Sequence, residues 1–216
     1  MNKRCFKGAL FDLDGVVFDT ETQYSIFWGR QFREYYPGSL EMEKLIKGQT
    51  LTEIYEQYFP DSAIQQEITR RLDSFESNME FNYIAGFEEF VSDIRANGVK
   101  TAVVTSSNIA KMDNVYSKRP EMKLYFDEIL TSEDFEQSKP SPDCYQKAAA
   151  RFGLGPDECV VFEDSFNGLK SGQSARMFVV GLATTNARQD IAQYSDFVVD
   201  SFDALDYGVM ADRIGK

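Results

Sequence analysis

The stretch FDLDGVVFDT, residues 11–20, places Asp12 directly after an apolar run, Asp14 two residues later and Asp19 five residues after that. Residues 7–11 are short, apolar and continuous, which predicts a buried strand that ends before Asp12. Asp14 lies two residues further on, on the same side of an extended chain, and Gly15 follows it. Carboxylates gathered at the end of a buried strand are costly unless a cation compensates them. The stretch therefore predicts a functional site.

The composition limits the class of protein. A chain of 216 residues with 43% hydrophobic content can bury one full core and a smaller accessory domain. The net charge of −12 argues against a nucleic-acid or anionic-membrane partner. Residues 1–8 lack the apolar segment of a signal peptide, and Cys5, Cys144 and Cys159 show no close pairing. We expect a cytoplasmic monomer that binds neither nucleic acid nor membrane.

The sequence contains no histidine. This excludes Ser–His and Cys–His nucleophile pairs, histidine metal ligands and histidine acid–base chemistry. Proton transfer near neutral pH must therefore use carboxylates, Lys, Tyr or Cys.

Residues 20–82 are predicted to form an all-helical insertion. Aromatic side chains from Tyr24 to Tyr35 recur at helical spacing, and Pro37-Gly38 ends that helix. We expect this aromatic stripe, with the exception of Tyr24, to form the core of the insertion. Further helical stretches are predicted at residues 41–47, 52–58 and 62–77.

The flanking segments, residues 1–19 and 83–216, show alternating strand and helix patterns. Such alternation predicts an α/β core with a parallel sheet covered on both faces. Strands are expected at residues 7–11, 101–105, 159–162, 177–182 and 197–199, and helices near residues 87–94, 141–153 and 165–176.

Polar residues follow the predicted strands. Asp12, Thr105 and the pair Glu163-Asp164 stand at strand ends, and Lys139 lies in a loop. The carboxyl ends of parallel strands form the ligand site of such sheets, so these groups are expected to meet. Oxygen ligands without histidine suit Mg²⁺, while Lys139 and Thr105 suit a phosphoryl group.

This arrangement predicts phosphoryl transfer. Asp12 can attack phosphorus and form an aspartyl-phosphate. Asp14 can protonate the leaving oxygen and later deprotonate water, if its environment keeps it protonated while Asp12 is ionised.

Four motifs resemble those of the haloacid dehalogenase superfamily over nearly the whole chain. They are Phe11-Asp12-Leu13-Asp14-Gly15, Thr105-Ser106, Lys139-Pro140 and Glu163-Asp164-Ser165, in that order. The helical insertion after the first motif is similar to the cap of the subgroup that contains β-phosphoglucomutase and many small sugar-phosphate phosphatases.

The resemblance implies a Rossmann-like core of residues 1–19 and 83–216, a helical cap of residues 20–82 and a Mg²⁺ cofactor. It implies metal binding by the Asp12 carboxylate, the Asp14 carbonyl and Asp164, with Glu163 as a further ligand or a neighbour of the ligands. Asp19-Thr20 corresponds to the hinge. The phosphate-binding residues would be Thr105, Ser106 and Lys139.

Some positions depart from the family pattern. Ser138 stands where Gly is common, and Arg176 replaces a usual Gly, which we interpret as a surface adjustment. The mutase has a His at the position of Tyr24 and an Arg at the position of Leu51, so these departures favour hydrolysis. The cap residues predicted to set specificity are Tyr24, Lys47 and Gln49.

We therefore predict a magnesium-dependent phosphatase acting on a small, sugar-phosphate-like metabolite. β-Phosphoglucomutase and inorganic pyrophosphatase are alternatives within the same class. A non-catalytic phospho-receiver domain is a more distant alternative, because a receiver lacks a helical insertion of ~60 residues after its first strand.

Overall fold

The computed structural model describes residues 6–39, 41–46, 49 and 51–215, and the chain divides into two compact units. Residues 20–80 form an all-helical unit, and the segments on either side of it together form the core unit. The second boundary lies two residues before the predicted one, after Glu80.

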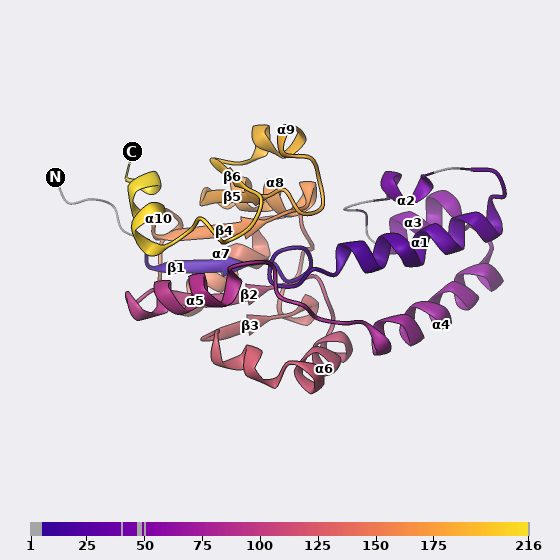
Figure 1. The fold of residues 1–216 in the computed structure, drawn as a ribbon, viewed down its shortest axis with the longest axis horizontal. Coiled ribbons are helices and arrows are strands. Elements are labelled where there is room, and N and C mark those ends of the chain that lie inside the picture. The colour runs from indigo at the N-terminus through magenta and orange to yellow at the C-terminus, as the bar shows by residue number, and fades with distance from the viewer. Residues whose placement is uncertain (1–5, 40, 47–48, 50, 216) are drawn as a thin grey trace. The chain divides into compact units, whose positions relative to one another are not determined.

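The core unit contains a parallel sheet with the strand order β3-β2-β1-β4-β5-β6 (Figure 1). The predicted α/β class is confirmed, but the strand β3 was not predicted, because its three residues include a glutamate and only two apolar side chains. The chain adds strands on one side of β1 and then on the other, so the strand order reverses at β1. The strands are β1 (Gly8–Phe11), β2 (Lys100–Val104), β3 (Glu128–Leu130), β4 (Cys159–Glu163), β5 (Phe178–Leu182) and β6 (Phe197–Val199).

Both faces of the sheet are covered, as the continuous apolar pattern of β1 requires. Leu10 belongs to a core cluster that includes residues of α7 (Asp143–Phe152) and α8 (Phe166–Ser174). Phe11, next in the strand, points to the opposite face. There its ring stacks on Phe162, with the ring centroids 4.6 Å apart, and contacts α5 (Phe87–Ala96).

The remaining elements complete the core unit. The helix α6 follows β2 and was not predicted, and α10 packs against α5. These helices are α6 (Ile109–Lys118), α9 (Arg188–Ile191) and α10 (Tyr207–Ile214), with 3-10 turns at Pro120–Leu124, Ser132–Asp134, Pro156–Glu158 and Ala192–Tyr194.

Arg176 follows the end of α8 with a φ of 61°, in the left-handed region. A helix commonly ends with a glycine in this conformation, because a Cβ is disfavoured there. The predicted helix therefore ends earlier than expected, at Ser174. The side chain of Arg176 is exposed, as expected of a change at the surface. Its left-handed backbone conformation adds strain that the sequence did not indicate.

The helical unit has its own apolar core. Phe27, Trp28 and Phe32 are buried, which confirms that the aromatic stripe is core, and they pack with residues of the following helices. Each predicted helical stretch contains a helix. The helices are α1 (Glu21–Tyr35), α2 (Met42–Leu45), α3 (Leu51–Tyr58) and α4 (Ser62–Asn78).

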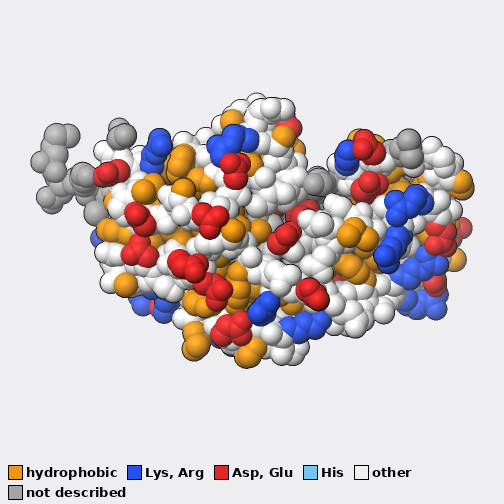
Figure 2. Space-filling view, viewed as in Figure 1, with side chains coloured by type: hydrophobic (Ala, Val, Ile, Leu, Met, Phe, Trp, Pro, Cys, Tyr) orange, Lys and Arg blue, Asp and Glu red, His pale blue; other side chains and the backbone are white. Residues whose placement is uncertain are grey.

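In Figure 2, basic side chains gather over the helical unit. Its helices α1 and α4 carry Arg30, Arg33, Arg70 and Arg71. Arg71 donates to Glu34 at 2.7 Å and to Gln31 at 3.0 Å, and both bonds join α4 to α1. Ion pairs this exposed contribute little individually, so the buried aromatic residues account for most of the stability of the unit.

Candidate active site

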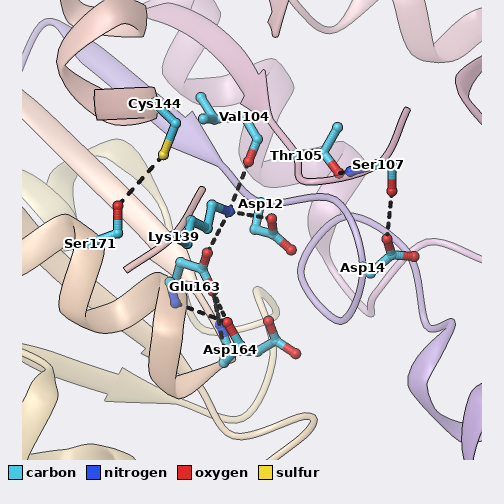
Figure 3. A network of polar contacts seen from close by, with 12 residues as sticks. Asp12, Asp14, Val104, Thr105, Ser107, Lys139, Cys144, Glu163, Asp164 and Ser171 are labelled. Atoms are coloured by element: carbon cyan, nitrogen blue, oxygen red, sulfur yellow. Dashed lines mark hydrogen bonds and ion pairs between the residues drawn. The ribbon is translucent and has the colours of Figure 1, made fainter. Parts of the chain in front are cut away.

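The predicted strand-end residues meet at the carboxyl edge of the sheet (Figure 3). Phe11 pairs with Val103 on β2 and with Phe162 on β4, so the residues that follow are neighbours. One carboxylate oxygen from each of Asp12, Glu163 and Asp164 lies within 4.8 Å of the others. Segments far apart in the sequence therefore gather three acids at the point where the strand order reverses.

Lys139 is the cation at the centre of this cluster. Its Nζ donates to Asp12 Oδ1 at 2.5 Å, to Glu163 Oε1 at 2.7 Å and to the Val104 carbonyl at 3.0 Å. These contacts use all three donors of the ammonium group. Burial by itself lowers the pKa of Lys139, but the Asp12 and Glu163 carboxylates raise it well above its ordinary value. Lys139 is therefore a permanent positive charge.

The single positive charge of Lys139 does not neutralise the negative charge of the cluster, and the pKa of Asp12 reflects this. Burial raises the pKa of Asp12 to about 7, Lys139 opposes this rise and Glu163 adds to it. Three carboxylates and one ammonium carry a net charge of −2 when all are ionised. A divalent cation would balance that charge, and carboxylate oxygens are the ligands that Mg²⁺ prefers. The residues present therefore fit the expected metal.

Glu163 is fully buried, and both of its carboxylate oxygens accept hydrogen bonds within the protein. Oε1 accepts from Lys139 and from the Tyr145 hydroxyl at 2.9 Å. Oε2 accepts from the backbone N–H groups of Asp164 and Ser165 and from the Ser165 hydroxyl. Gly168 makes room for this carboxylate, since a Cβ there would lie 1.7 Å from Oε1. Tyr145 and Gly168 were not identified from the sequence.

Asp164 is almost fully buried, and the first motif turns against it. Gly15 has a φ of 75°, and a Cβ on it would lie 2.0 Å from Asp164 Oδ2. Glycine is therefore required at position 15 both by the turn and by the close approach of the backbone. The Thr185 hydroxyl donates to Asp164 Oδ2, a contact that the sequence did not indicate.

Asp14 contacts a different set of residues. Its Oδ2 accepts from Lys111 Nζ at 2.6 Å and from the Ser107 hydroxyl at 3.2 Å. In Figure 3 the Asp14 carboxylate points toward Ser107, away from the pair of Asp12 and Lys139. The sequence did not indicate Lys111, because the helix that carries it was not predicted.

The second motif supplies two hydroxyl groups of different exposure. Thr105 is buried and its Oγ1 accepts from the Ser107 N–H at 3.0 Å, so it also shapes the loop. Ser106 is exposed to solvent. Phosphate binding by either residue stays a prediction.

The predicted specificity residues belong to the helical unit. The Tyr24 hydroxyl donates to Glu76 at 2.7 Å, and its ring packs edge-on against Phe75. Gln49 donates to the Leu45 carbonyl at 3.1 Å. Lys47 lies outside the described residues. The assignment of substrate specificity to these positions stays a prediction.

Comparison with known proteins identifies the family. The family model described as haloacid dehalogenase-like hydrolase matches residues 9–182, so the chain belongs to this family of hydrolases. Hexitol phosphatase A of Escherichia coli is 30% identical over 213 residues, which cover 94% of each chain. The bifunctional riboflavin kinase/FMN phosphatase of Arabidopsis thaliana is 26% identical over 90% of this chain, which spans only about half (51%) of that relative.

The fold comparison agrees with the sequence comparison. The structure of β-phosphoglucomutase from Clostridium difficile superposes with a TM-score of 0.76 at 22% identity, and 97% of each chain is covered. At this identity the likeness shows the fold alone. The predicted family and the prediction of an enzyme, a phosphoric monoester hydrolase, are confirmed by the family match and by relatives that are phosphatases. Among the described residues, no helix is long and apolar enough to cross a bilayer.

Proposed function

We propose that this chain is a magnesium-dependent phosphatase that hydrolyses a small phosphorylated metabolite through an aspartyl-phosphate. The observation that carries the proposal is the buried cluster of Asp12, Lys139, Glu163 and Asp164 at the end of β1. Its net negative charge suits a divalent cation, and its lysine suits a phosphoryl group. The phosphatase relatives support the same reaction class.

Asp12 is the proposed nucleophile. Its carboxylate oxygen attacks phosphorus, the bond from phosphorus to the ester oxygen breaks, and the phosphoryl group is transferred to Asp12. Lys139, held 2.5 Å from Asp12 Oδ1, is placed to stabilise charge on the phosphoryl oxygens. Thr105 and Ser106 are proposed to donate hydrogen bonds to the same group.

Asp14 is the proposed acid and base. It gives a proton to the leaving oxygen in the first step, which requires a protonated Asp14 although the ion pair with Lys111 favours the ionised form. In the second step it takes a proton from the water that attacks the aspartyl-phosphate. The product alcohol and inorganic phosphate are then released, and both carboxyl groups return to their starting state.

The metal is proposed to be held by the Asp12 carboxylate, the Asp14 carbonyl and Asp164. When bound, Mg²⁺ would offset the negative charge of the cluster and of the substrate phosphate. We assign Glu163 to a supporting role, because its oxygens already accept hydrogen bonds from Lys139, Tyr145 and the following loop. It holds Lys139 on Asp12.

The test is a phosphate-release assay over a panel of phosphorylated metabolites with Mg²⁺, including pyrophosphate and β-glucose 1-phosphate. We expect release of inorganic phosphate from at least one phosphomonoester, and none by Asp12→Asn, which is nearly isosteric. Conversion of β-glucose 1-phosphate without phosphate release would identify a mutase instead. A stable phosphoprotein without turnover would identify a receiver.

A further inference from the structure

The loop that follows β5 brings three successive polar side chains to the active site. The Thr184 hydroxyl donates to the Gly15 carbonyl at 2.6 Å, and the Thr185 hydroxyl donates to Asp164 Oδ2. The Asn186 amide donates to the Asp164 carbonyl at 3.0 Å. One short segment therefore binds both the turn of the first motif and the aspartate that follows β4.

This loop is anchored at both ends. At its start, the Ala183 N–H donates to the Val199 carbonyl at 2.8 Å. At its end, the side chain of Arg188, the first residue of α9, donates to the Val198 carbonyl, also at 2.8 Å. Both bonds tie the loop to β6, so its threonines project from a fixed backbone.

Thr185 lies in a closely packed part of the site. Thr185 is 6% exposed and Asp164 is 2% exposed. A Cβ added to Gly15 would lie 2.0 Å from Asp164 Oδ2 and 2.8 Å from the Thr185 hydroxyl oxygen. A buried carboxylate needs hydrogen-bond donors in place of water, and Thr185 supplies one of them. Packing and the hydrogen bond together restrict the orientation of the Asp164 carboxylate.

Thr184 acts on the neighbouring part of the first motif. The peptide between Asp14 and Gly15 carries the proposed carbonyl ligand, and its N–H donates to the Phe18 carbonyl at 2.8 Å. Thr184 holds the next peptide through the Gly15 carbonyl. The loop after β5 therefore supports the surroundings of two proposed metal ligands, the Asp14 carbonyl and the Asp164 carboxylate.

We propose that Thr184 and Thr185 are positioning residues for the divalent cation and give the site its preference for Mg²⁺ over Ca²⁺. This inference rests on the proposed function, because it takes Asp164 and the Asp14 carbonyl as ligands. Neither hydroxyl needs to touch the cation, since hydrogen bonds to ligating groups fix their orientation. Mg²⁺ demands near-ideal octahedral geometry, whereas Ca²⁺ accepts irregular ligand positions. Loss of positioning should therefore weaken Mg²⁺ binding more than Ca²⁺ binding.

Isothermal titration calorimetry of the metal-free protein with MgCl₂ and with CaCl₂ tests this without substrate. Loss of a hydrogen bond to a metal ligand commonly weakens metal binding 10–100-fold, so we expect Thr185→Val to raise the Kd for Mg²⁺ by ~10–100-fold. The Kd for Ca²⁺ should rise by less than about 3-fold. Thr185→Ser keeps the hydroxyl and should hold the Kd for Mg²⁺ within about 3-fold of wild type. Thr184→Val should show the same selectivity with a smaller loss, because it acts on a neutral carbonyl.

Ser195→Ala is the matched control, because Ser195 lies on the same connection between β5 and β6. Its hydroxyl donates to the Ile191 carbonyl at 3.0 Å rather than to a group of the site. We expect this variant to bind both cations as the wild type does. Urea unfolding in the presence of EDTA shows which variants are folded and how much stability each has lost.

Several outcomes would overturn the inference. In Thr185→Val, an unchanged Kd for Mg²⁺ or equal losses for both cations would do so. A loss in Thr185→Ser as large as in Thr185→Val would show that the hydroxyl is not what matters. If Thr185→Val does not fold, Thr184→Val decides, because it must still lower the preference for Mg²⁺.

The failure of the proposed function can be told apart from the failure of this inference. If Asp164→Asn binds Mg²⁺ as tightly as the wild type, Asp164 is not a ligand, and the proposed metal site and the inference fail together. If Asp164→Asn loses Mg²⁺ while Thr185→Val retains it, only the inference fails. If the variants behave as expected but the wild type releases phosphate from no ester, the proposed reaction fails and the inference stands.

Discussion

Asp12 and Glu163 are two buried carboxylates that share one ammonium group. Glu163 accepts hydrogen bonds from five donors, while Asp12 has a pKa of about 7 that burial raises and Lys139 opposes. At the residue scale, protein donors stabilise the charge of Glu163, and a cation is needed to stabilise that of Asp12. This difference separates a supporting carboxylate from a reactive one.

The loss of Lys139 should destabilise the protein strongly. Lys139→Met removes the partner of two buried carboxylates, and the loss of one partner of a buried ion pair costs ~3–5 kcal/mol. Urea unfolding in the presence of EDTA should show this decrease in the free energy of unfolding. Glu163→Gln should lower the free energy of unfolding less, because Lys139 keeps Asp12 as a partner. If Lys139→Met were as stable as the wild type, the assignment of Lys139 as the central cation would be contradicted.

Removal of the divalent cation should stop phosphate release reversibly. The cluster carries a net charge of −2 when ionised, and a bound cation also stabilises the folded state. We expect Mg²⁺ to raise the melting temperature of the wild type and to raise it less in Asp164→Asn. Full activity after dialysis against EDTA would refute the metal requirement.

At the scale of elements, the termini of the helices that follow β2 and β4 arrange the site. The cap of α6 places Ser107 and Lys111 at Asp14, and the start of α8 places the N–H group and hydroxyl of Ser165 at Glu163. The other end of α8 carries strain instead, because Arg176 has a φ of 61°. The two ends of one helix thus differ in how well the local sequence suits the backbone.

Replacement of Arg176 by glycine should stabilise the protein. A non-glycine residue in the left-handed region costs about 1 kcal/mol, and Arg176→Gly removes that cost. We expect a gain of ~0.5–1 kcal/mol in urea unfolding, without change in phosphate release. Lys170→Gly, inside the same helix, is the matched control and should lose ~1 kcal/mol. A loss of stability in Arg176→Gly would contradict the strain argument.

At the scale of the whole molecule, each unit has its own core. In the core unit both faces of the sheet are buried, and in the helical unit aromatic side chains are buried among the helices. Cys144 and Cys159 lie in the apolar core of the core unit, and burial raises the pKa of Cys159 to about 12.

These two thiols should report the opening of the core unit. At pH 8 we expect neither to react with a colorimetric disulfide reagent in the folded protein, because each is buried and protonated. Both should react once urea unfolds the chain, in parallel with the loss of circular dichroism. The variant Cys5→Ser removes the third thiol from the measurement. Fast reaction of Cys144 or Cys159 without denaturant would show that the unit opens locally.

The sequence by itself determined the class of the fold and the acids of the site. Hydrophobic runs that end in Asp12 and Glu163-Asp164 are local patterns, and parallel topology brings the ends of such strands together. The strand β3 and helix α6 escaped prediction because short or weakly periodic segments carry little local signal. The helical segments of residues 20–80 were recognisable from their spacing alone.

Lys139 was predicted at the site, but only the tertiary structure showed which other groups accompany those acids. Lys111 is 97 residues from Asp14, Thr185 is 21 residues from Asp164, and Tyr145 is 18 residues from Glu163. Each looks like an ordinary helix or loop residue, because its role depends on a partner brought near by folding. Burial likewise exists only in the folded chain, and it is what gives Asp12 its raised pKa and makes a compensating cation necessary.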